Sequence, residues 1–150
     1  MIRLLIVLLC VWQGLNAQTT FEVEQQVFEL INQHRSSIGL NALIKSDIIF
    51  TESRKHSAGM AAGRVNYGHD GFSNRAGVIR RVTRCGMMGE NVNYTWGKDV
   101  ARRAVNSWLN SKGHRENIEK PNFTISGVGV AKDRSGMFYL TQIFGVKRLN

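Results

Sequence analysis

The chain has 150 residues, and its 20 lysines and arginines outweigh 11 aspartates and glutamates to give a formal net charge of +9. This length predicts a single domain, and the sequence shows no repeats, low-complexity tracts or linkers. A nucleic-acid-binding role is disfavoured despite the charge, because the basic residues do not alternate with aromatic ones as they do on a base-stacking surface.

The first seventeen residues have the layout of a secretory signal peptide. Arg3 supplies the early positive charge, the apolar run LLIVLLCVW follows, and Ala17 is a small residue suited to cleavage. The run is shorter than the roughly 20 residues that a membrane-spanning helix needs. We therefore expect cleavage after Ala17 and a secreted product, extracellular or periplasmic, of residues 18–150. A lipoprotein anchored through Cys10 is less favoured, because no small residues precede that cysteine.

Loss of this leader would leave Cys85 as the sole cysteine and a net charge near +8. With one cysteine there is no internal disulfide framework, so the fold must be held by its core. Cys85 is then either a buried small apolar residue or an exposed thiol that pairs with a partner. The excess positive charge favours anionic surfaces such as lipid headgroups or cell-wall polymers, although solubility explains most of it.

Two helices and a loop are predicted in the first half of the mature chain. Apolar residues recur at helical spacing over residues 21–37. A second helix begins at Ser46, a suitable N-cap, and ends near Gly63. The stretch VNYGHDGFSNRAG is rich in glycine and asparagine and predicts a loop, after which a short helix covers residues 76–82.

The second half predicts one helix and three strands. A strand is expected at residues 89–94, then a helix at residues 98–109 that closes at Gly113 within NSKGHRENI. A hairpin follows, with strands at residues 125–131 and 137–144. Helices followed by an antiparallel hairpin predict an α+β fold in which helices pack on the faces of a small sheet.

Three titratable residues in glycine-containing segments are the candidates for a functional site. His69 lies in YGHDGF, Glu90 in MGEN and His114 in KGHREN. Two imidazoles and a carboxylate can hold Zn²⁺ with an open position for water, or can transfer protons. The separations are too long for a local motif, and neither HExxH nor CxxC is present, so spacing alone does not bring the three together.

Five segments in this order resemble the CAP (SCP) superfamily of cysteine-rich secretory, antigen 5 and pathogenesis-related proteins: YGHDGF, GEN, WLNSKGHRENI, SGVGVA and YLTQIFG. The resemblance is strongest to the bacterial secreted branch and covers almost all of residues 18–150. It implies a three-layer α-β-α sandwich with a central antiparallel sheet. It also implies an open cleft lined by His69, Glu90 and His114. Many eukaryotic members carry a second glutamate three residues after the helix tryptophan, a position that Ser111 takes here.

The two remaining histidines have other expected places. His56 lies on the second helix, either at the rim of that cleft or as a half-buried residue packed on the following loop. His34 ends the first helix, where a cation complements the negative helix end, and no function is assigned to it. In NSKGHRENI, Asn117 and Ile118 are expected to fix the shape of the turn, leaving His114 free to point into the cleft.

The resemblance implies an extracellular binding module. Its cleft would take a lipid, a sterol or another cell-surface ligand, with His69 and His114 able to hold a divalent cation such as Zn²⁺ and Ser111 beside them. The alternative is a metal-dependent, peptidase-like hydrolase in which Glu90 acts as the base. A third reading is a protein that binds the cell envelope through charge alone. The sequence leaves open whether the protein is an enzyme.

Overall fold

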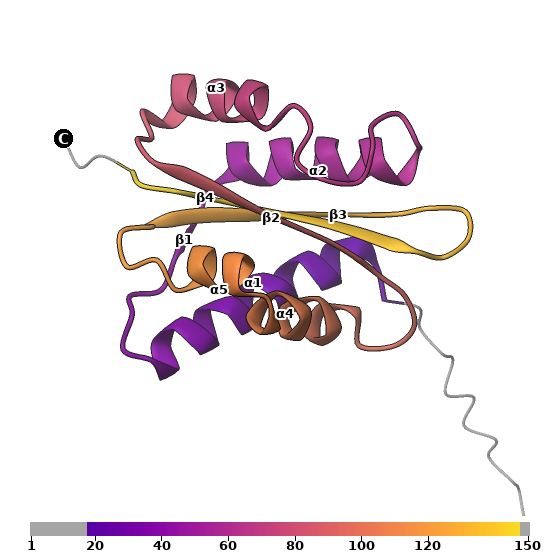
Figure 1. Ribbon diagram of the computed structural model, residues 1–150, viewed down its shortest axis with the longest axis horizontal. Coiled ribbons are helices and arrows are strands. Elements are labelled where there is room, and N and C mark those ends of the chain that lie inside the picture. Colours follow the sequence, from indigo (N-terminus) through magenta and orange to yellow (C-terminus); the bar gives the residue numbers. More distant parts are fainter. Residues whose placement is uncertain (1–17, 148–150) are drawn as a thin grey trace, which may run out of the picture.

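The computed structural model describes residues 18–147, so the predicted leader, with Cys10 and the cleavage point at Ala17, lies outside the described residues. The architecture is three layers, with helices on both faces of one four-stranded sheet (Figure 1). This confirms the predicted α+β sandwich. Within residues 18–147 we find no helix that is long and apolar enough to cross a membrane.

The sheet has the strand order β1-β3-β4-β2. Its strands are β1 (Ile44–Lys45), β2 (Met88–Thr95), β3 (Ile125–Lys132) and β4 (Phe138–Gly145). Strands β2, β4 and β3 form an antiparallel ladder, whereas β1 runs parallel to β3. The expected antiparallel sheet is therefore present in these three strands, and the two-residue β1 adds a parallel pair at one edge. Parallel strands need a crossover connection, and the helices between β1 and β3 supply it.

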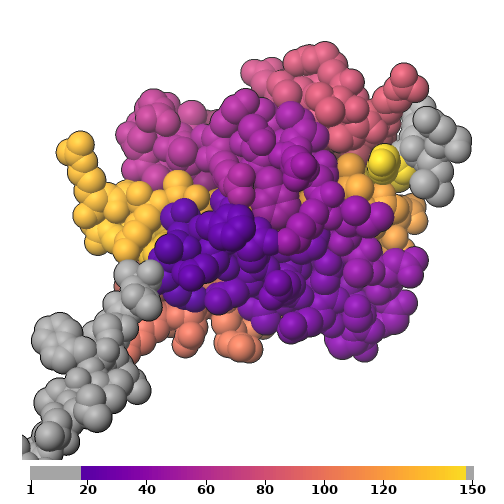
Figure 2. All heavy atoms as spheres, turned by 180° about the vertical axis from the view of Figure 1, so that it is seen from behind, coloured from indigo at the N-terminus to yellow at the C-terminus, as the bar shows by residue number. Residues whose placement is uncertain are grey.

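Helices cover both faces of the sheet (Figure 1). On the first face lie α2 (Asp47–Ala61) and α3 (Phe72–Thr83). On the second lie α1 (Thr20–Ser37), α4 (Val100–Asn110) and α5 (Lys112–Ile118). Seen from behind in Figure 2, α1 occupies the middle of the surface, with α2 and α3 above it.

Two helix boundaries differ from the sequence prediction. Helix α3 begins at Phe72, four residues earlier than expected, because the loop before it ends at Gly71 in the left-handed conformation. Gly113 does not end a helix. Helix α4 stops at Asn110, Ser111 takes an extended conformation, and α5 starts again at Lys112 with Gly113 and His114 inside it.

Two glycines of β3 let α2 lie directly on the sheet. A Cβ atom at Gly129 would come within 2.0 Å of the Arg54 backbone nitrogen, and one at Gly127 within 2.4 Å of the Phe50 backbone nitrogen. The close approach allows the Ser57 hydroxyl to donate a hydrogen bond of 2.8 Å to the Gly129 carbonyl. The SGVGVA segment therefore serves helix-to-sheet packing.

The core fills both interfaces between sheet and helices. The larger cluster lies under α1 and α4 and includes the fully buried Trp108 and Phe144. The smaller one joins Ile49 of α2, Ile79 of α3 and Ile143 of β4 around Cys85. Cys85 is buried, and burial raises the pKa of its thiol. Of the two predicted roles for this cysteine, the structure supports the small apolar residue.

Candidate functional site

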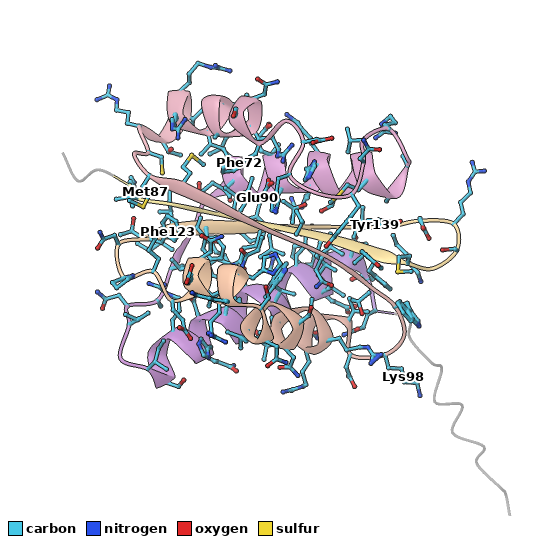
Figure 3. The ribbon with its side chains drawn as sticks, viewed as in Figure 1. Phe72, Met87, Glu90, Lys98, Phe123 and Tyr139 are labelled. Atoms are coloured by element: carbon cyan, nitrogen blue, oxygen red, sulfur yellow. The ribbon has the colours of Figure 1, made fainter. Side chains whose placement is uncertain are left out.

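The segment Gly89-Glu90-Asn91 opens β2, the strand at one edge of the sheet. Side chains of a strand alternate between its two faces. Glu90 meets residues of α3 and the loop before it, whereas Asn91 meets α5 on the opposite face. Figure 3 shows Glu90 near the middle of the molecule, where β2 crosses the other strands. This edge is where segments from both helical layers meet.

The Glu90 carboxylate is held by two partners and is almost wholly out of solvent, with 1% of its side chain exposed. His69 Nδ1 lies 3.0 Å from Oε1. Arg75 donates from Nε to Oε2 at 3.0 Å and from Nη2 to both oxygens at 2.9 and 2.8 Å. Since a carboxylate only accepts, His69 Nδ1 carries the hydrogen of this contact, and in the neutral ring Nε2 is left with its lone pair.

The loop that carries His69 is fixed at three points. Arg75 Nη1 donates to the Asp70 carbonyl at 2.7 Å. His56 Nε2 lies 2.8 Å from the Gly68 carbonyl and donates to it, while burial in α2 lowers the pKa of His56. Of the two places expected for His56, the structure supports packing on the loop. Gly71 takes a φ of 75°, which favours glycine and turns the loop into α3.

Helix α5 is attached to β2 through two asparagines. Asn91 Nδ2 donates to the His114 carbonyl at 3.0 Å, and Asn117 Nδ2 donates to Asn91 Oδ1 at 2.9 Å. Gly89 leaves the room for this contact, because a Cβ there would come within 2.7 Å of Asn117 Oδ1. Each residue of the GEN segment thus has a distinct role: Gly89 admits Asn117, Glu90 binds His69, and Asn91 anchors the backbone of His114.

His69 and His114 come from opposite helical layers and approach the same edge of the sheet. His114 is partly buried, and its pKa is lowered first by burial and further by the neighbouring His69. Burial and the nearby His69 therefore keep His114 neutral over a wider pH range than a free histidine. Ser111 lies in the break between α4 and α5, three residues before His114.

The donor set determines what the site can hold. Within residues 18–147, no group of three or more His, Cys, Asp and Glu side chains is arranged to hold a metal ion. The Glu90 carboxylate is contacted by both Arg75 and His69. What remains is two imidazoles, both of them good Zn²⁺ ligands, and no third protein ligand beside them among the described residues.

Arg75 is the site residue that the sequence analysis missed. In the sequence it is one of many basic residues, whose excess is explained mostly by solubility, yet only 11% of its side chain is exposed. It follows His69 by six residues, which gives no periodic signal. One signal could have found it. A glutamate buried in a strand needs a cation as its partner, and Arg75 is a cation close in sequence to the His69 segment.

His34 has no part in this cluster. Its Nε2 lies 2.9 Å from Glu119 Oε1, a contact that joins the last turn of α1 to the residue after α5. The pairing gives His34 a structural contact outside the cluster.

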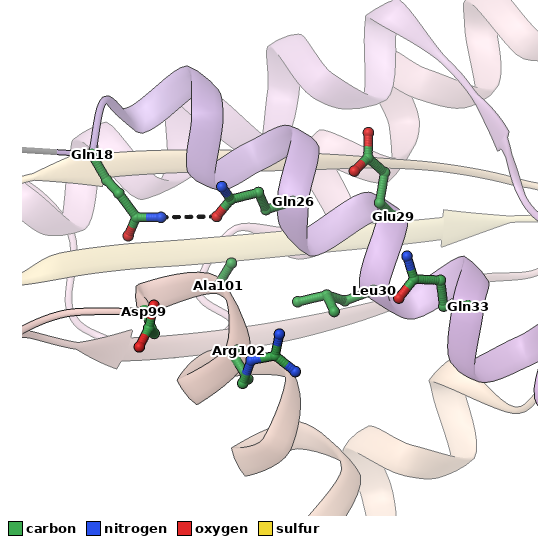
Figure 4. A pocket seen from close by; sticks show the side chains of 8 residues that line it. All are labelled: Gln18, Gln26, Glu29, Leu30, Gln33, Asp99, Ala101 and Arg102. Atoms are coloured by element: carbon green, nitrogen blue, oxygen red, sulfur yellow. Dashed lines mark hydrogen bonds between the residues drawn. The ribbon is translucent and has the colours of Figure 1, made fainter. Parts of the chain in front are cut away.

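A separate hollow of about 290 Å³ lies between α1 and α4, with polar side chains along most of its wall (Figure 4). Gln26, Glu29 and Gln33 line it from α1, and Arg102 lines it from α4. None of the residues of the His69, Glu90 and His114 cluster lines it.

Comparison with known proteins places these features in a family. The family described as "CAP: Cysteine-rich secretory protein family" matches residues 28–144. The uncharacterised protein YkwD of Bacillus subtilis is 31% identical over 126 residues, which cover 81% of this chain and 47% of YkwD. The chain thus spans about half the length of that relative.

Solved structures show the same fold. An extracellular protein with an SCP domain from Bacillus anthracis superposes with a TM-score of 0.72 and 28% identity, over 85% of this chain and 41% of that one. An outer surface protein of Borrelia burgdorferi superposes with a TM-score of 0.74 and 19% identity, over 87% and 97% of the two chains.

Proposed function

The chain belongs to the CAP, or cysteine-rich secretory protein, family, and from this premise we propose that it is an extracellular binding module whose ligand contacts His69 and His114 at the β2 edge of the sheet. The class of ligand is a lipid, a sterol or another component of a cell surface. Glu90 orients His69 in this site, and Ser111 lies at its margin.

The observation that carries the proposal is the contact between His69 Nδ1 and the buried Glu90 carboxylate at 3.0 Å. A carboxylate on one ring nitrogen fixes the orientation and the tautomer of an imidazole, so that the other nitrogen is presented in a defined direction. The His69 side chain is also 53% exposed, so a ligand can reach the imidazole from solvent. A histidine with a purely structural role would not need both features.

An extracellular location is supported by two independent arguments. The first seventeen residues have the composition of a signal peptide. The Bacillus anthracis structure with an SCP domain is described as an extracellular protein, and the Borrelia burgdorferi structure is described as an outer surface protein. We propose the same destination for this chain.

A divalent cation fits the site only in part. His69 and His114 would hold it through imidazole nitrogen, and such an ion would supply positive charge to attract an anionic or carbonyl oxygen of the ligand. With two protein ligands its affinity is expected to be well below that of a zinc site with three. The ion would therefore assist ligand binding and would not be a tightly held structural metal.

The hydrolase alternative assigns Glu90 as the base. A base must be free to take a proton, whereas Arg75 and His69 together contact both oxygens of Glu90. This geometry favours an orienting role for Glu90 and weighs against a catalytic one.

The test is calorimetric titration of residues 18–150 with Zn²⁺, and separately with a dispersed sterol, for the native sequence and for His69→Ala and His114→Ala. We expect each variant to bind both probes at least about tenfold more weakly. The matched control is His34→Ala, which removes a partly exposed histidine outside the site and should leave both affinities unchanged.

Equal affinities in all four proteins would eliminate the role of the two imidazoles. If His69→Ala and His114→Ala lose Zn²⁺ binding but bind the sterol as the native protein does, the two histidines form a metal site, and the sterol is not its ligand. A peptidase assay with Glu90→Gln completes the test, because turnover that this variant abolishes would favour the hydrolase instead.

A further inference from the structure

The last turn of α3 and the connection to β2 form an exposed basic and apolar surface, which we call the α3 tip and define as Arg80, Arg81, Val82, Arg84 and Met87. All five residues are exposed. Helix α3 is the outermost element on its side of the sheet, and its last turn lies at the same end of the molecule as the end of β4 (Figure 1). Figure 3 places Met87 at this end.

The charge of the α3 tip is not balanced by neighbours in sequence or by ion pairs. No acidic residue occurs between Asp70 and Glu90. Among residues 18–147, the salt bridges do not include Arg80, Arg81 or Arg84, in contrast to Arg75, whose charge is taken up by Glu90. The end of β4 adds Lys147, because Val146 is hydrogen-bonded to Met87 and Gly86.

Two large apolar side chains lie in the same surface. Val82 is 65% exposed and Met87 is 50% exposed. Neither side chain belongs to the nearby core cluster, to which this segment contributes Ile79, Cys85 and Met88 instead. Arginines at the end of a helix can be explained by the negative helix terminus. That explanation does not account for the exposed Val82 and Met87 in the same surface.

We propose that the α3 tip docks on an anionic lipid surface, with the arginines and Lys147 at the headgroup phosphates and with Val82 and Met87 at the boundary of headgroups and acyl chains. Clustered basic residues are attracted to anionic bilayers, and adjacent apolar side chains insert at that depth. A soluble polyanion would use the arginines alone. The two apolar residues are the reason to choose a lipid surface.

The docking surface is distinct from the His69 site. Arg75 and Ile79 point inward, whereas the residues of the α3 tip lie on the outside of the same helix and just after it. Substitutions at Arg81 and Arg84 therefore leave the contacts of Glu90 in place. Failure of this proposal and failure of the proposed function can be told apart.

The experiment is flotation of residues 18–150, which contain every described element, with vesicles of phosphatidylcholine alone or with about 30% phosphatidylglycerol. We expect binding only with phosphatidylglycerol. The variant Arg81→Gln with Arg84→Gln should bind about thirtyfold more weakly, since two cations near the bilayer are removed. The matched control, Arg102→Gln with Arg103→Gln, makes the same charge change on the exposed face of α4 and should retain native binding.

A second variant separates a membrane from a soluble polyanion. Val82→Ser with Met87→Ser should weaken vesicle binding while leaving retention on a dextran sulfate column unchanged. Equal binding to both kinds of vesicle would overturn the proposal. Native vesicle binding by the Arg81 and Arg84 variant would overturn it too, as would an equal loss of binding in the α4 control. Native vesicle binding by the Val82 and Met87 variant would also overturn it, because charge alone would then explain the binding.

Discussion

The Arg75 guanidinium of α3 and the Glu90 carboxylate of β2 form a bidentate ion pair. Only 11% and 1% of their side chains are exposed. The same carboxylate receives His69, so one buried charge pair determines where the candidate ligand-binding imidazole lies. The stability of the fold and the geometry of the site therefore depend on the same two residues.

The first prediction concerns this pair. Arg75→Met should lower the free energy of unfolding by about 3–5 kcal/mol, because it leaves a buried carboxylate without its cation. Urea denaturation measures the change. The double variant Arg75→Met with Glu90→Leu should recover part of the loss, since no unpaired charge remains. Additive losses in the double variant would show that the pair is not coupled.

The second prediction concerns the packing of α2 on β3. Gly129→Ala should cost at least about 3 kcal/mol or prevent folding, because the added Cβ would lie 2.0 Å from a backbone nitrogen that cannot move independently of its helix. Thermal unfolding followed by circular dichroism measures it. A loss below about 1 kcal/mol would mean that α2 can shift away from the sheet.

The third prediction tests the corrected position of Gly113. This glycine lies in α5 with no atom near the site of a Cβ, and its φ is not positive. Gly113→Ala should therefore stabilise the protein by about 0.5–1 kcal/mol. A destabilised variant would instead indicate the left-handed helix end that the sequence suggested.

The fourth prediction concerns the placement of His114. Gly89→Ala should displace the Asn117 amide, which holds α5 against β2, and cost about 1–3 kcal/mol. The imidazole resonances of His114 in an NMR spectrum should shift, whereas those of His34 should not. Unchanged His114 resonances would show that α5 is positioned by other contacts.

The fifth prediction concerns acid. Burial lowers the pKa of His56 below the usual 6.5, so the unfolded chain takes up a proton at this residue before the folded chain does. Stability should therefore fall as the pH drops from 6.5 towards the folded pKa, by at most about 1.4 kcal/mol per pH unit from this residue. The lowered pKa of His114 acts in the same direction. Unfolding followed between about pH 7.5 and 5 should show a shallower decline in His56→Gln.

The parts of the fold that the sequence predicted well are those with a periodic apolar pattern. The first helix, observed at Thr20–Ser37, and the strand observed at Phe138–Gly145 each differ from the prediction by one residue. Strand β1 was missed because its two residues carry no period. Gly113 was misread because a glycine inside a helix and a glycine that ends one look alike in a single sequence.

The candidate site depends on contacts that sequence distance conceals. His69 and Glu90 are 21 residues apart, and their hydrogen bond follows from the path of α3 over the sheet. Arg75 was overlooked because charge is not a guide to burial: three of its neighbours on the same segment, at positions 80, 81 and 84, are exposed. Only the packing of α3 shows which arginine faces inward.

The order of the strands has a consequence for how this chain is made. Strand β4 is hydrogen-bonded along its whole length to both β2 and β3, yet it is the last element of the fold in the order of synthesis. Until residue 145 has left the ribosome, β2 has no partner on which to form a sheet. Nascent chains should therefore stay open and be accessible to chaperones until β4 has been synthesised, and a stop codon shortly before position 138 should give a product that proteases remove.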